Sequence, residues 1–210
     1  EKDSTAAAIF EVWFGRLSST VFRPLVPPET WNIARRMVSI RTLLRVVREP
    51  DATLFPGGNA AVKRDLALAI ALDEAIVELE QLLGPDMTKW RWGALHIASF
   101  AHPMADAKSP ERAAFSLGPV ERGGDGNTVN ATAGANYRQS SGASYRQVLD
   151  LSNWDNSTAT NTPGQSGQPE SMHYDDLLKL WAREEHFPLV YSRAAVEKNA
   201  KSRLMLLPAR

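Results

Sequence analysis

The sequence has 210 residues, 43% hydrophobic and 23% charged, which is typical of one large or two small globular domains and excludes general disorder. Its 24 basic and 24 acidic residues balance, so the overall charge gives no reason to expect binding to nucleic acid or anionic lipid. The absence of cysteine excludes disulfides, a thiolate nucleophile and cysteine-ligated metals. No apolar run approaches the roughly 18–20 residues that cross a bilayer.

The first half has the apolar spacing of helices. Ser4 or Thr5 can cap a helix with four large side chains on one face, namely Phe10, Trp13, Phe14 and Leu17. A second helix is predicted from Glu29 to Arg48, with an apolar face of Ile33, Met37, Ile40, Leu44 and Val47. The longest helix is predicted from Ala61 to Leu83. Besides its main stripe it has a second apolar face at Leu66, Ile70 and Val77, which indicates burial between neighbouring elements.

The predicted second helix is rich in arginine and has no acidic residue between Trp31 and Arg48. Its arginines are Arg35, Arg36, Arg41, Arg45 and Arg48. Such a face is compatible with phosphate binding, but a nucleic-acid-binding protein is expected to have a basic footprint that a chain of zero net charge lacks. We therefore favour a packed helix whose guanidinium groups pair with carboxylates.

The second half, from about Trp90, loses the helical period. Strands are predicted over Thr128–Ala133 and Tyr145–Leu151, paired through turns at Gly134 and Gly142. Further predictions are a third strand at Tyr137–Gln139, a linker at Asn153–Ser171, helices at Asp175–Glu184 and Ala194–Ala200, and a last strand at Leu204–Leu207. The fold class is α+β, with helices followed by antiparallel strands. A mainly helical segment, 1–89, and a strand-rich segment, 90–210, are expected to form one structural unit of a longer protein.

Few residues have a pattern that carries chemistry. The four histidines, His96, His102, His173 and His186, lack the paired spacing of zinc ligands, so we predict structural roles for them and no metal or cofactor. The glycines at 123–126 do not match a phosphate-binding loop and predict a turn with positive φ. The Asp155-Asn156-Ser157 stretch is too short for a calcium loop. Ser166 lies between glycines but outside a nucleophile elbow, and would need a base within reach.

Two stretches of the sequence carry a recognisable series of short motifs. The first is WRWGALH at 90–96 with FAHP at 100–103. The second comprises GGDGNTVNA at 123–131, WDNS at 154–157, PGQSG at 163–167 and HYDDL at 173–177. Each motif is weak alone, but in this order and spacing they resemble the C-terminal part of the large chain of the penicillin acylase (penicillin amidase) family. The resemblance extends over roughly 31–203.

This resemblance implies an N-terminal-nucleophile hydrolase with an αββα sandwich. Members are made as one precursor that cuts itself into a small and a large chain, and many are exported to the periplasm. The new first residue of the large chain, usually Ser, attacks the substrate amide with its own α-amino group as base. Backbone donors and an Asn stabilise the oxyanion. Penicillin-, cephalosporin- and acyl-homoserine-lactone-type substrates are thereby split into a carboxylic acid and an amine.

The chain departs from the family at its first residue, because Glu1 cannot supply that nucleophile. The resemblance therefore implies a fragment that is inactive alone and has the rest of the large chain and the small chain as partners. The zero net charge and the lack of a long apolar run predict that it binds neither nucleic acid nor membrane. Unpaired strand edges predict self-association of the isolated fragment. Two alternatives are a non-catalytic binding or scaffolding module, and a chain that assembles with separately made pieces.

Asp150 is the one candidate for a supporting role in catalysis, and no residue is predicted to be catalytic itself. Its position, ahead of the WDNS motif, matches a carboxylate that cephalosporin-type members place against a histidine near the nucleophile. Such a carboxylate would orient the imidazole. The alternative is a strand-end residue that accepts hydrogen bonds from neighbouring backbone amides.

Overall fold

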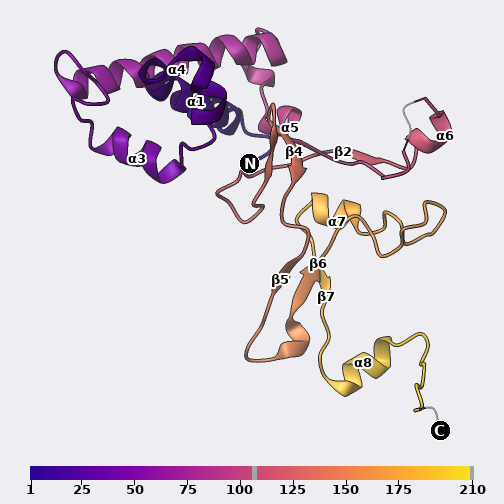
Figure 1. Ribbon diagram of the computed structural model, residues 1–210. Coiled ribbons are helices and arrows are strands. Elements are labelled where there is room, and N and C mark those ends of the chain that lie inside the picture. Colours follow the sequence, from indigo (N-terminus) through magenta and orange to yellow (C-terminus); the bar gives the residue numbers. More distant parts are fainter. Residues whose placement is uncertain (106–107, 209–210) are drawn as a thin grey trace. The chain divides into compact units, whose positions relative to one another are not determined.

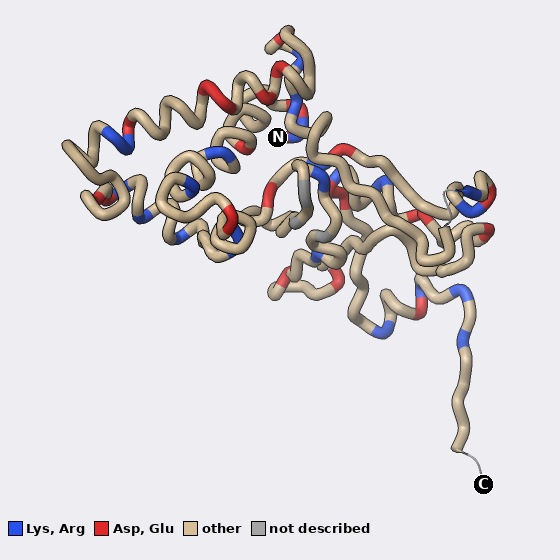
Figure 2. The backbone as a smooth tube through the Cα atoms, turned by 45° about the horizontal axis from the view of Figure 1, so that its top comes forward, with Lys and Arg blue, Asp and Glu red and all other residues tan. Residues whose placement is uncertain are grey.

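The computed structural model describes residues 1–105 and 108–208. Helices dominate the first half and short strands the second, which confirms the predicted α+β class (Figure 1). The chain divides into two compact units. The helical unit comprises Glu1–His96 and Glu121–Asp125, and the strand unit comprises Ile97–Val120 and Gly126–Arg210. Acidic and basic residues are spread along the backbone of both units (Figure 2).

The helical unit is built on two long helices, α1 (Thr5–Phe22) and α4 (Ala60–Leu83). Ser4 caps α1 as predicted, since its Oγ accepts a hydrogen bond from Ala7 N at 3.1 Å. The two helices pack along their length, and the indole of Trp13 donates to Leu68 O at 3.1 Å. None of the helices in the described part of the chain has the length and apolar character needed to cross a membrane.

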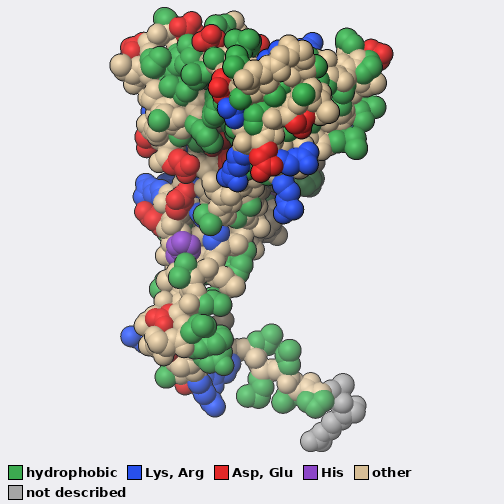
Figure 3. Space-filling view, turned by 90° about the vertical axis from the view of Figure 1, so that its left-hand side faces the viewer, with side chains coloured by type: hydrophobic (Ala, Val, Ile, Leu, Met, Phe, Trp, Pro, Cys, Tyr) green, Lys and Arg blue, Asp and Glu red, His purple; other side chains and the backbone are tan. Residues whose placement is uncertain are grey.

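The core of the helical unit lies between α1, α4 and the shorter helix α3 (Ile40–Arg48). Its buried members are Leu17, Val21, Leu43, Val46, Phe55 and Ala71. The predicted apolar face of α1 is only partly buried, because Trp13 and Phe14 pack against this core while Phe10 is 49% exposed. The second apolar face of α4 was predicted to be buried between neighbouring elements. In this chain its side chains Leu66, Ile70 and Val77 are exposed. Figure 3 shows abundant hydrophobic side chains at the surface of the helical unit.

The prediction of a single helix from Glu29 to Arg48 is wrong. After the 3₁₀ turn η1 (Arg23–Leu25), the chain forms a second 3₁₀ turn, η2 (Pro28–Thr30), then α2 (Trp31–Ala34), and after a break α3. Ser39 causes a new start because its extended backbone (φ −82°, ψ 153°) lets its Oγ accept a hydrogen bond from Thr42 N at 3.2 Å. The break changes the buried face, so Leu43 and Val46 are buried while Ile33 and Met37 are exposed.

The strand unit contains a four-stranded sheet in the order β2-β1-β4-β3. Its strands are β1 (Ile97–Phe100), β2 (Leu117–Glu121), β3 (Ala133–Ala135) and β4 (Arg138–Ser141). β3 and β4 form an antiparallel hairpin whose two turn residues, Asn136 and Tyr137, have φ of 53° and 64°. β1 and β4 pair in parallel, so the sheet is not purely antiparallel as predicted.

A second sheet has the order β5-β6-β7 and is antiparallel. β5 (Arg146–Val148) falls inside the predicted strand at Tyr145–Leu151, and β7 spans Phe187–Pro188. The central strand β6 (Thr158–Thr160) lies in the segment predicted to be a linker, and its Ala159 and Thr160 are fully buried. The linker prediction is therefore wrong, since this segment supplies the middle of a sheet.

Two other strand predictions are wrong. Most of Thr128–Ala133 forms a turn instead, because Ala131 has a φ of 44° and its N–H donates to Thr128 O at 2.9 Å. Its predicted pairing with the Tyr145 strand is consequently absent, since β5 pairs with β6 and β3 with β4. Leu204–Leu207 has no regular structure and all four side chains are at least 73% exposed.

The remaining elements are short helices and 3₁₀ turns. The helices predicted at Asp175–Glu184 and Ala194–Ala200 correspond to a shorter α7 (Leu178–Ala182) and to α8 (Arg193–Asn199). Short elements that were not predicted are η3 (Met87–Lys89), α5 (Trp92–Leu95), α6 (Pro110–Ala113) and η4 (Trp154–Asn156). In the strand unit α7 packs its Leu178 and Trp181 against Ala98 of β1, and the ring of Trp181 meets Phe100 edge-on at 5.5 Å.

Candidate functional site

Asp150 lies at the surface of the strand unit, where it organises its own loop. One carboxylate oxygen, Oδ1, accepts hydrogen bonds from Ser152 N (2.9 Å), Ser152 Oγ (2.6 Å) and Asn153 N (3.2 Å). The other, Oδ2, accepts from Asn156 Nδ2 at 3.2 Å. These bonds, led by the Ser152 hydroxyl, lower the pKa of Asp150 to about 2. Bonding within its own loop is what we expect if Asp150 is a strand-end residue that accepts hydrogen bonds from its neighbours. In the described part of the chain no imidazole contacts Asp150.

The WDNS motif anchors the next segment. Asp155 Oδ1 accepts hydrogen bonds from Tyr191 N at 2.8 Å and Ser192 N at 2.7 Å, and the rings of Trp154 and Tyr191 lie 5.0 Å apart. Hydrogen bonding by Ser192, first from its side chain and then from its backbone N–H, lowers the pKa of Asp155, and the N–H of Tyr191 adds to the effect. The motif therefore joins the loop after β5 to the start of α8.

Ser166 lies in a tight loop, and among the residues that the structure describes no base lies beside its hydroxyl. Its Oγ accepts a hydrogen bond from Gln168 N at 3.1 Å, as in a serine-containing turn. The backbone N–H groups of Gln165 and Ser166 both donate to His173 O, at 2.8 and 3.0 Å. The imidazole of His173 instead pairs with Asp176 through Nδ1, at 2.8 Å from Oδ2. Within the described residues, nothing activates Ser166 as a nucleophile.

Two other histidines pack against aromatic rings. His96 is buried and stacks on Trp92, with ring centroids 4.7 Å apart and planes inclined by 8°. His102 meets Phe115 edge-on at 5.5 Å, and its Nδ1 accepts a hydrogen bond from Met104 N at 3.1 Å. Among residues 1–105 and 108–208, no three histidine, aspartate or glutamate side chains lie close enough together to hold a metal ion.

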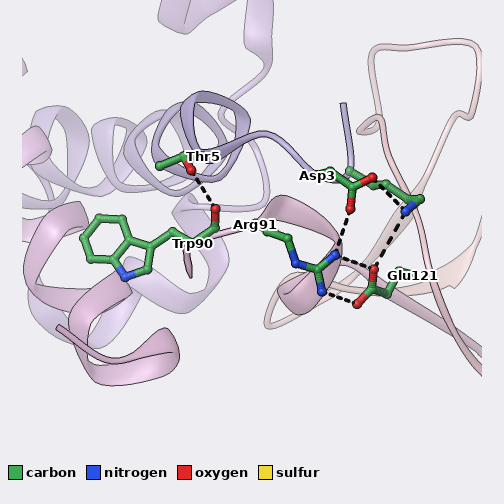
Figure 4. A network of polar contacts seen from close by, with 6 residues as sticks. Asp3, Thr5, Trp90, Arg91 and Glu121 are labelled. Carbon is green, nitrogen blue, oxygen red and sulfur yellow. Dashed lines mark hydrogen bonds and ion pairs between the residues drawn. The ribbon is translucent and has the colours of Figure 1, made fainter. Parts of the chain in front are cut away.

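The WRW motif at 90–92 forms a network of polar contacts in the helical unit (Figure 4). Arg91 donates to both carboxylate oxygens of Glu121, at 2.8 and 2.7 Å, and to Asp3 Oδ1 at 2.8 Å. Thr5 Oγ1 donates to Trp90 O at 2.8 Å, and the buried indole of Trp90 donates to Gly84 O at 2.8 Å. The motif thus ties the N-terminal segment to the end of β2, and no sequence pattern marks its partners Asp3 and Glu121.

The glycine-rich turn after β2 is held from inside the same unit. The indole of Trp92 donates to Gly124 O at 2.9 Å, and Gly124 has the predicted positive φ, at 75°. Half-buried Glu11 lies near Asp125 and Glu1. Burial first, then repulsion from these two carboxylates, raises the pKa of Glu11 to about 7. No sequence motif marks Glu11, because its perturbation arises only from tertiary packing.

The strand unit has a small surface cavity of about 220 Å³. Its walls combine the rings of Phe100 and Trp181 with the polar residues Ser99, Gln139 and Thr162. None of the residues that the sequence singled out for chemistry lines it. The described residues thus contain scaffolding networks but no assembled pair of nucleophile and base.

Comparison with known proteins places these observations in context. The sequence model of the penicillin amidase family matches residues 1–198. The acyl-homoserine lactone acylase QuiP of Pseudomonas fluorescens Pf-5 is 27% identical over 99% of this chain and 26% of its own length. The penicillin acylase 2 proenzyme of Pseudomonas sp. SE83 is 37% identical over 65% of this chain and 18% of its own length.

Among solved structures, the thermostable penicillin G acylase of Alcaligenes faecalis aligns with 99% of this chain and 39% of its own, at 22% identity and a TM-score of 0.49. The chain spans about a quarter or less of the length of the curated relatives named above. Because the family model covers nearly all of the sequence, the chain belongs to the penicillin amidase family.

Proposed function

We propose that this chain is the C-terminal part of the large chain of an acylase that hydrolyses N-acyl amide bonds to a carboxylic acid and an amine. The observation that carries the proposal is the family match over residues 1–198. It is supported by relatives that are named as acyl-homoserine lactone and penicillin acylases. We propose the same two classes of substrate, acylated homoserine lactones and acylated β-lactams, for the complete enzyme.

The reaction requires parts that this chain does not assemble. A nucleophile must attack the amide carbonyl while a base takes its proton, and donors must stabilise the resulting oxyanion. In the described residues Ser166 bonds only a backbone amide through its hydroxyl, and Asp150 bonds only its own loop. We therefore place the nucleophile, its amino-group base and the oxyanion donors in the preceding part of the large chain, as the family resemblance implies.

The contribution of residues 1–210 is then architectural. The motif residues that resemble the family fix the backbone, with Arg91 joining three segments and the indole of Trp181 donating to Ala143 O at 2.8 Å. Arg146 donates to Trp181 O at 2.6 Å, while burial lowers the pKa of its guanidinium. Such fixed networks hold a neighbouring active site in its productive geometry. The partners in this proposal are the rest of the large chain and the small chain, and the proposed compartment is the periplasm.

The test compares this chain with the longer polypeptide that contains it. Both are incubated with a phenylacetyl anilide and with an N-acyl homoserine lactone, and the released amine is measured. We expect turnover by the longer polypeptide and none by residues 1–210. Turnover by the isolated chain that is lost in Ser166→Ala would contradict the placement of the nucleophile. An inactive longer polypeptide, tested on both substrates after maturation, would contradict the proposed function itself.

A further inference from the structure

The exposed side of α3 carries a row of arginines that we name the arginine ridge, formed by Arg41, Arg45 and Arg48. Their spacing of i, i+4 and i+7 places them on one face of the helix, opposite the buried Leu43 and Val46. Two more exposed arginines, Arg35 and Arg36, precede α3. Figure 2 shows basic residues around α3, whereas acidic residues recur along α4.

The arginines of the ridge have no carboxylate partner within 4.0 Å in the described part of the chain. Three other arginines of the helical unit do have one, namely Arg16 with Glu78, Arg64 with Asp65, and Arg91 with Glu121. The pairing with carboxylates that we predicted for this helix is therefore not found. The ridge is locally unfavourable, since like charges three and four residues apart on a helix repel each other.

Two local effects stabilise only some of the positive charges of the ridge. Arg45 and Arg48 lie in the last turn of α3, where a positive charge is favourable. Asp51 is bound mainly by Thr53, and the attraction of Arg45 is the weakest of the effects on the lowered pKa of this aspartate. Arg41 lies in the first turn, where a cation is not favoured. An unpaired positive charge at the N-terminal end of α3 therefore needs stabilisation from a group outside the helix.

Exposed apolar side chains border the ridge. Ile33 and Met37 precede α3 and are 69% and 80% exposed, while Ile40 and Leu44, on the helix itself, are 40% and 36% exposed. Arginine and methionine beside aliphatic side chains are enriched in protein interfaces. The opposite side of α3 is packed into the core through Leu43 and Val46, so the helix keeps only the narrow apolar border of Ile40 and Leu44 for contact with a lipid layer, whereas interfacial helices use a broad apolar face.

We infer that the arginine ridge and its apolar border form a docking surface for an acidic surface on the remaining polypeptide of the same enzyme. The inference rests on the proposed function, because it needs the large part of the relatives' length that this chain does not span. Carboxylates fit the chemistry, since the planar guanidinium can donate two parallel hydrogen bonds to one carboxylate. The bordering aliphatic groups exclude water from those pairs.

Chemical modification of arginine tests the docking. Phenylglyoxal labelling, read by mass spectrometry, compares residues 1–210 with the longer, matured polypeptide. We expect Arg41, Arg45 and Arg48 to react at least about tenfold more slowly in the longer polypeptide, and the protection to weaken as salt is raised. Equal reactivity in an active longer polypeptide would overturn the inference and leave the proposed function intact. Protection in an inactive polypeptide would support the docking and count against the proposed function.

A charge reversal provides the second readout. Arg41→Glu should leave the isolated chain as stable or slightly more stable, because the new carboxylate would attract Arg45 four residues on. In the longer polypeptide the same change should lower Tm, since it sets like charges against each other. Arg112→Glu, at an exposed arginine of α6, is the matched control and should show no such opposite effects. If Arg41→Glu lowers Tm in both the isolated chain and the longer polypeptide, or raises it in both, the inference is overturned.

A membrane is the competing occupant. If the ridge is protected only when phosphatidylglycerol vesicles are added to the longer polypeptide, and Arg41→Glu abolishes that protection, the partner is a lipid surface and our assignment is wrong. Phosphatidylcholine vesicles serve as the neutral control. A reading frame that encodes nothing beyond residues 1–210 would overturn the docking inference and the proposed function together.

Discussion

Arg91 and Glu121 are thirty residues apart in the sequence and form a two-pronged ion pair, with Nη1 2.8 Å from Oε2 and Nη2 2.7 Å from Oε1. Asp3 completes the cluster by accepting from Arg91 Nη1 at 2.8 Å. The pair lowers the pKa of Glu121, chiefly through the hydrogen bond from Arg91. One side chain of the WRW motif thus joins the N-terminal segment, α5 and the end of β2 (Figure 4).

Replacing Arg91 should therefore loosen the N-terminal segment. We expect Arg91→Ala to lower the free energy of unfolding by about 1 kcal/mol, because the pair is partly exposed but bidentate. Arg91→Lys should recover only part of this loss, since an ammonium group cannot reproduce the fork. Urea unfolding measures the difference. Full rescue by lysine would show that charge alone matters.

The raised pKa of Glu11 predicts how the stability of the protein depends on pH. Native Glu11 keeps its proton up to a pKa of about 7, whereas the unfolded chain releases it near the ordinary value of 4.5. Between these values the native state binds more protons, so stability falls as pH rises through this window. Glu11→Gln should remove the fall and make the protein more stable at pH 8 by about 1 kcal/mol, a figure reduced for solvent screening.

The measurement for Glu11 is thermal unfolding at several pH values between 4 and 8. Glu80→Gln, at an exposed position of α4, is the matched control and should leave the pH profile unchanged. Identical profiles for the wild-type chain and Glu11→Gln would show that the carboxyl is solvated like any surface glutamate.

Gly164 supplies a steric prediction in the PGQSG motif. A Cβ added at Gly164 would lie 2.3 Å from His173 O and 2.5 Å from Tyr174 O, both backbone atoms. We expect Gly164→Ala to cost about 1–3 kcal/mol in unfolding free energy, because the loop must shift and loses the bonds to His173 O. Gly167→Ala, where nothing lies within 4 Å, should change stability by less than about 0.5 kcal/mol. Equal effects at the two glycines, measured by thermal unfolding, would contradict this.

Local signals predicted several helix ends and one of the short helices. Ser4 as a cap, Gly84 as the end of α4 and the α8 helix follow from short-range chemistry, and the structure confirms each. The predicted helix over Glu29–Arg48 failed because periodicity treats serine as neutral, whereas the Ser39 hydroxyl replaces a backbone partner and restarts the helix. The second apolar face of α4 is exposed although burial was predicted, because periodicity marks an apolar face without showing what covers it.

Strand pairing was the least predictable feature. β6 reads as linker because Thr158, Ala159 and Thr160 are short and follow a polar run, yet its neighbours on both sides bury it. The hairpin of β3 and β4 depends on positive φ at Asn136 and Tyr137, of which only the asparagine is a recognisable turn residue. Asp150 was the one site residue singled out from the sequence, while the partners of Arg91 and the setting of Glu11 depend on contacts far apart in the chain.

Asp150 allows its two interpretations to be separated by kinetics. We expect Asp150→Asn in the longer polypeptide to change kcat by less than about threefold, because the carboxylate serves its own loop. Its pKa of about 2 means that the bonds it makes at neutral pH are lost only as the pH falls through that value. A loss of kcat by about two orders of magnitude, with a shifted pH profile, would instead show that Asp150 orients an imidazole.

The outer face of α4 predicts self-association of the isolated chain. Val62, Leu66, Ile70 and Val77 recur at helical spacing and are 63%, 59%, 41% and 52% exposed, forming an apolar stripe of a kind that monomers rarely leave open. We expect sedimentation velocity to show dimers or larger species that shift toward monomer in Leu66→Gln with Ile70→Gln. Because both side chains are exposed in the single chain, the double variant should keep its fold and its unfolding free energy to within about 1 kcal/mol.

Met172→Gln, at a 78% exposed methionine of the strand unit, is the matched control and should leave the association unchanged. A monomer at all concentrations, or equal dissociation in the control, would show that this face does not drive association.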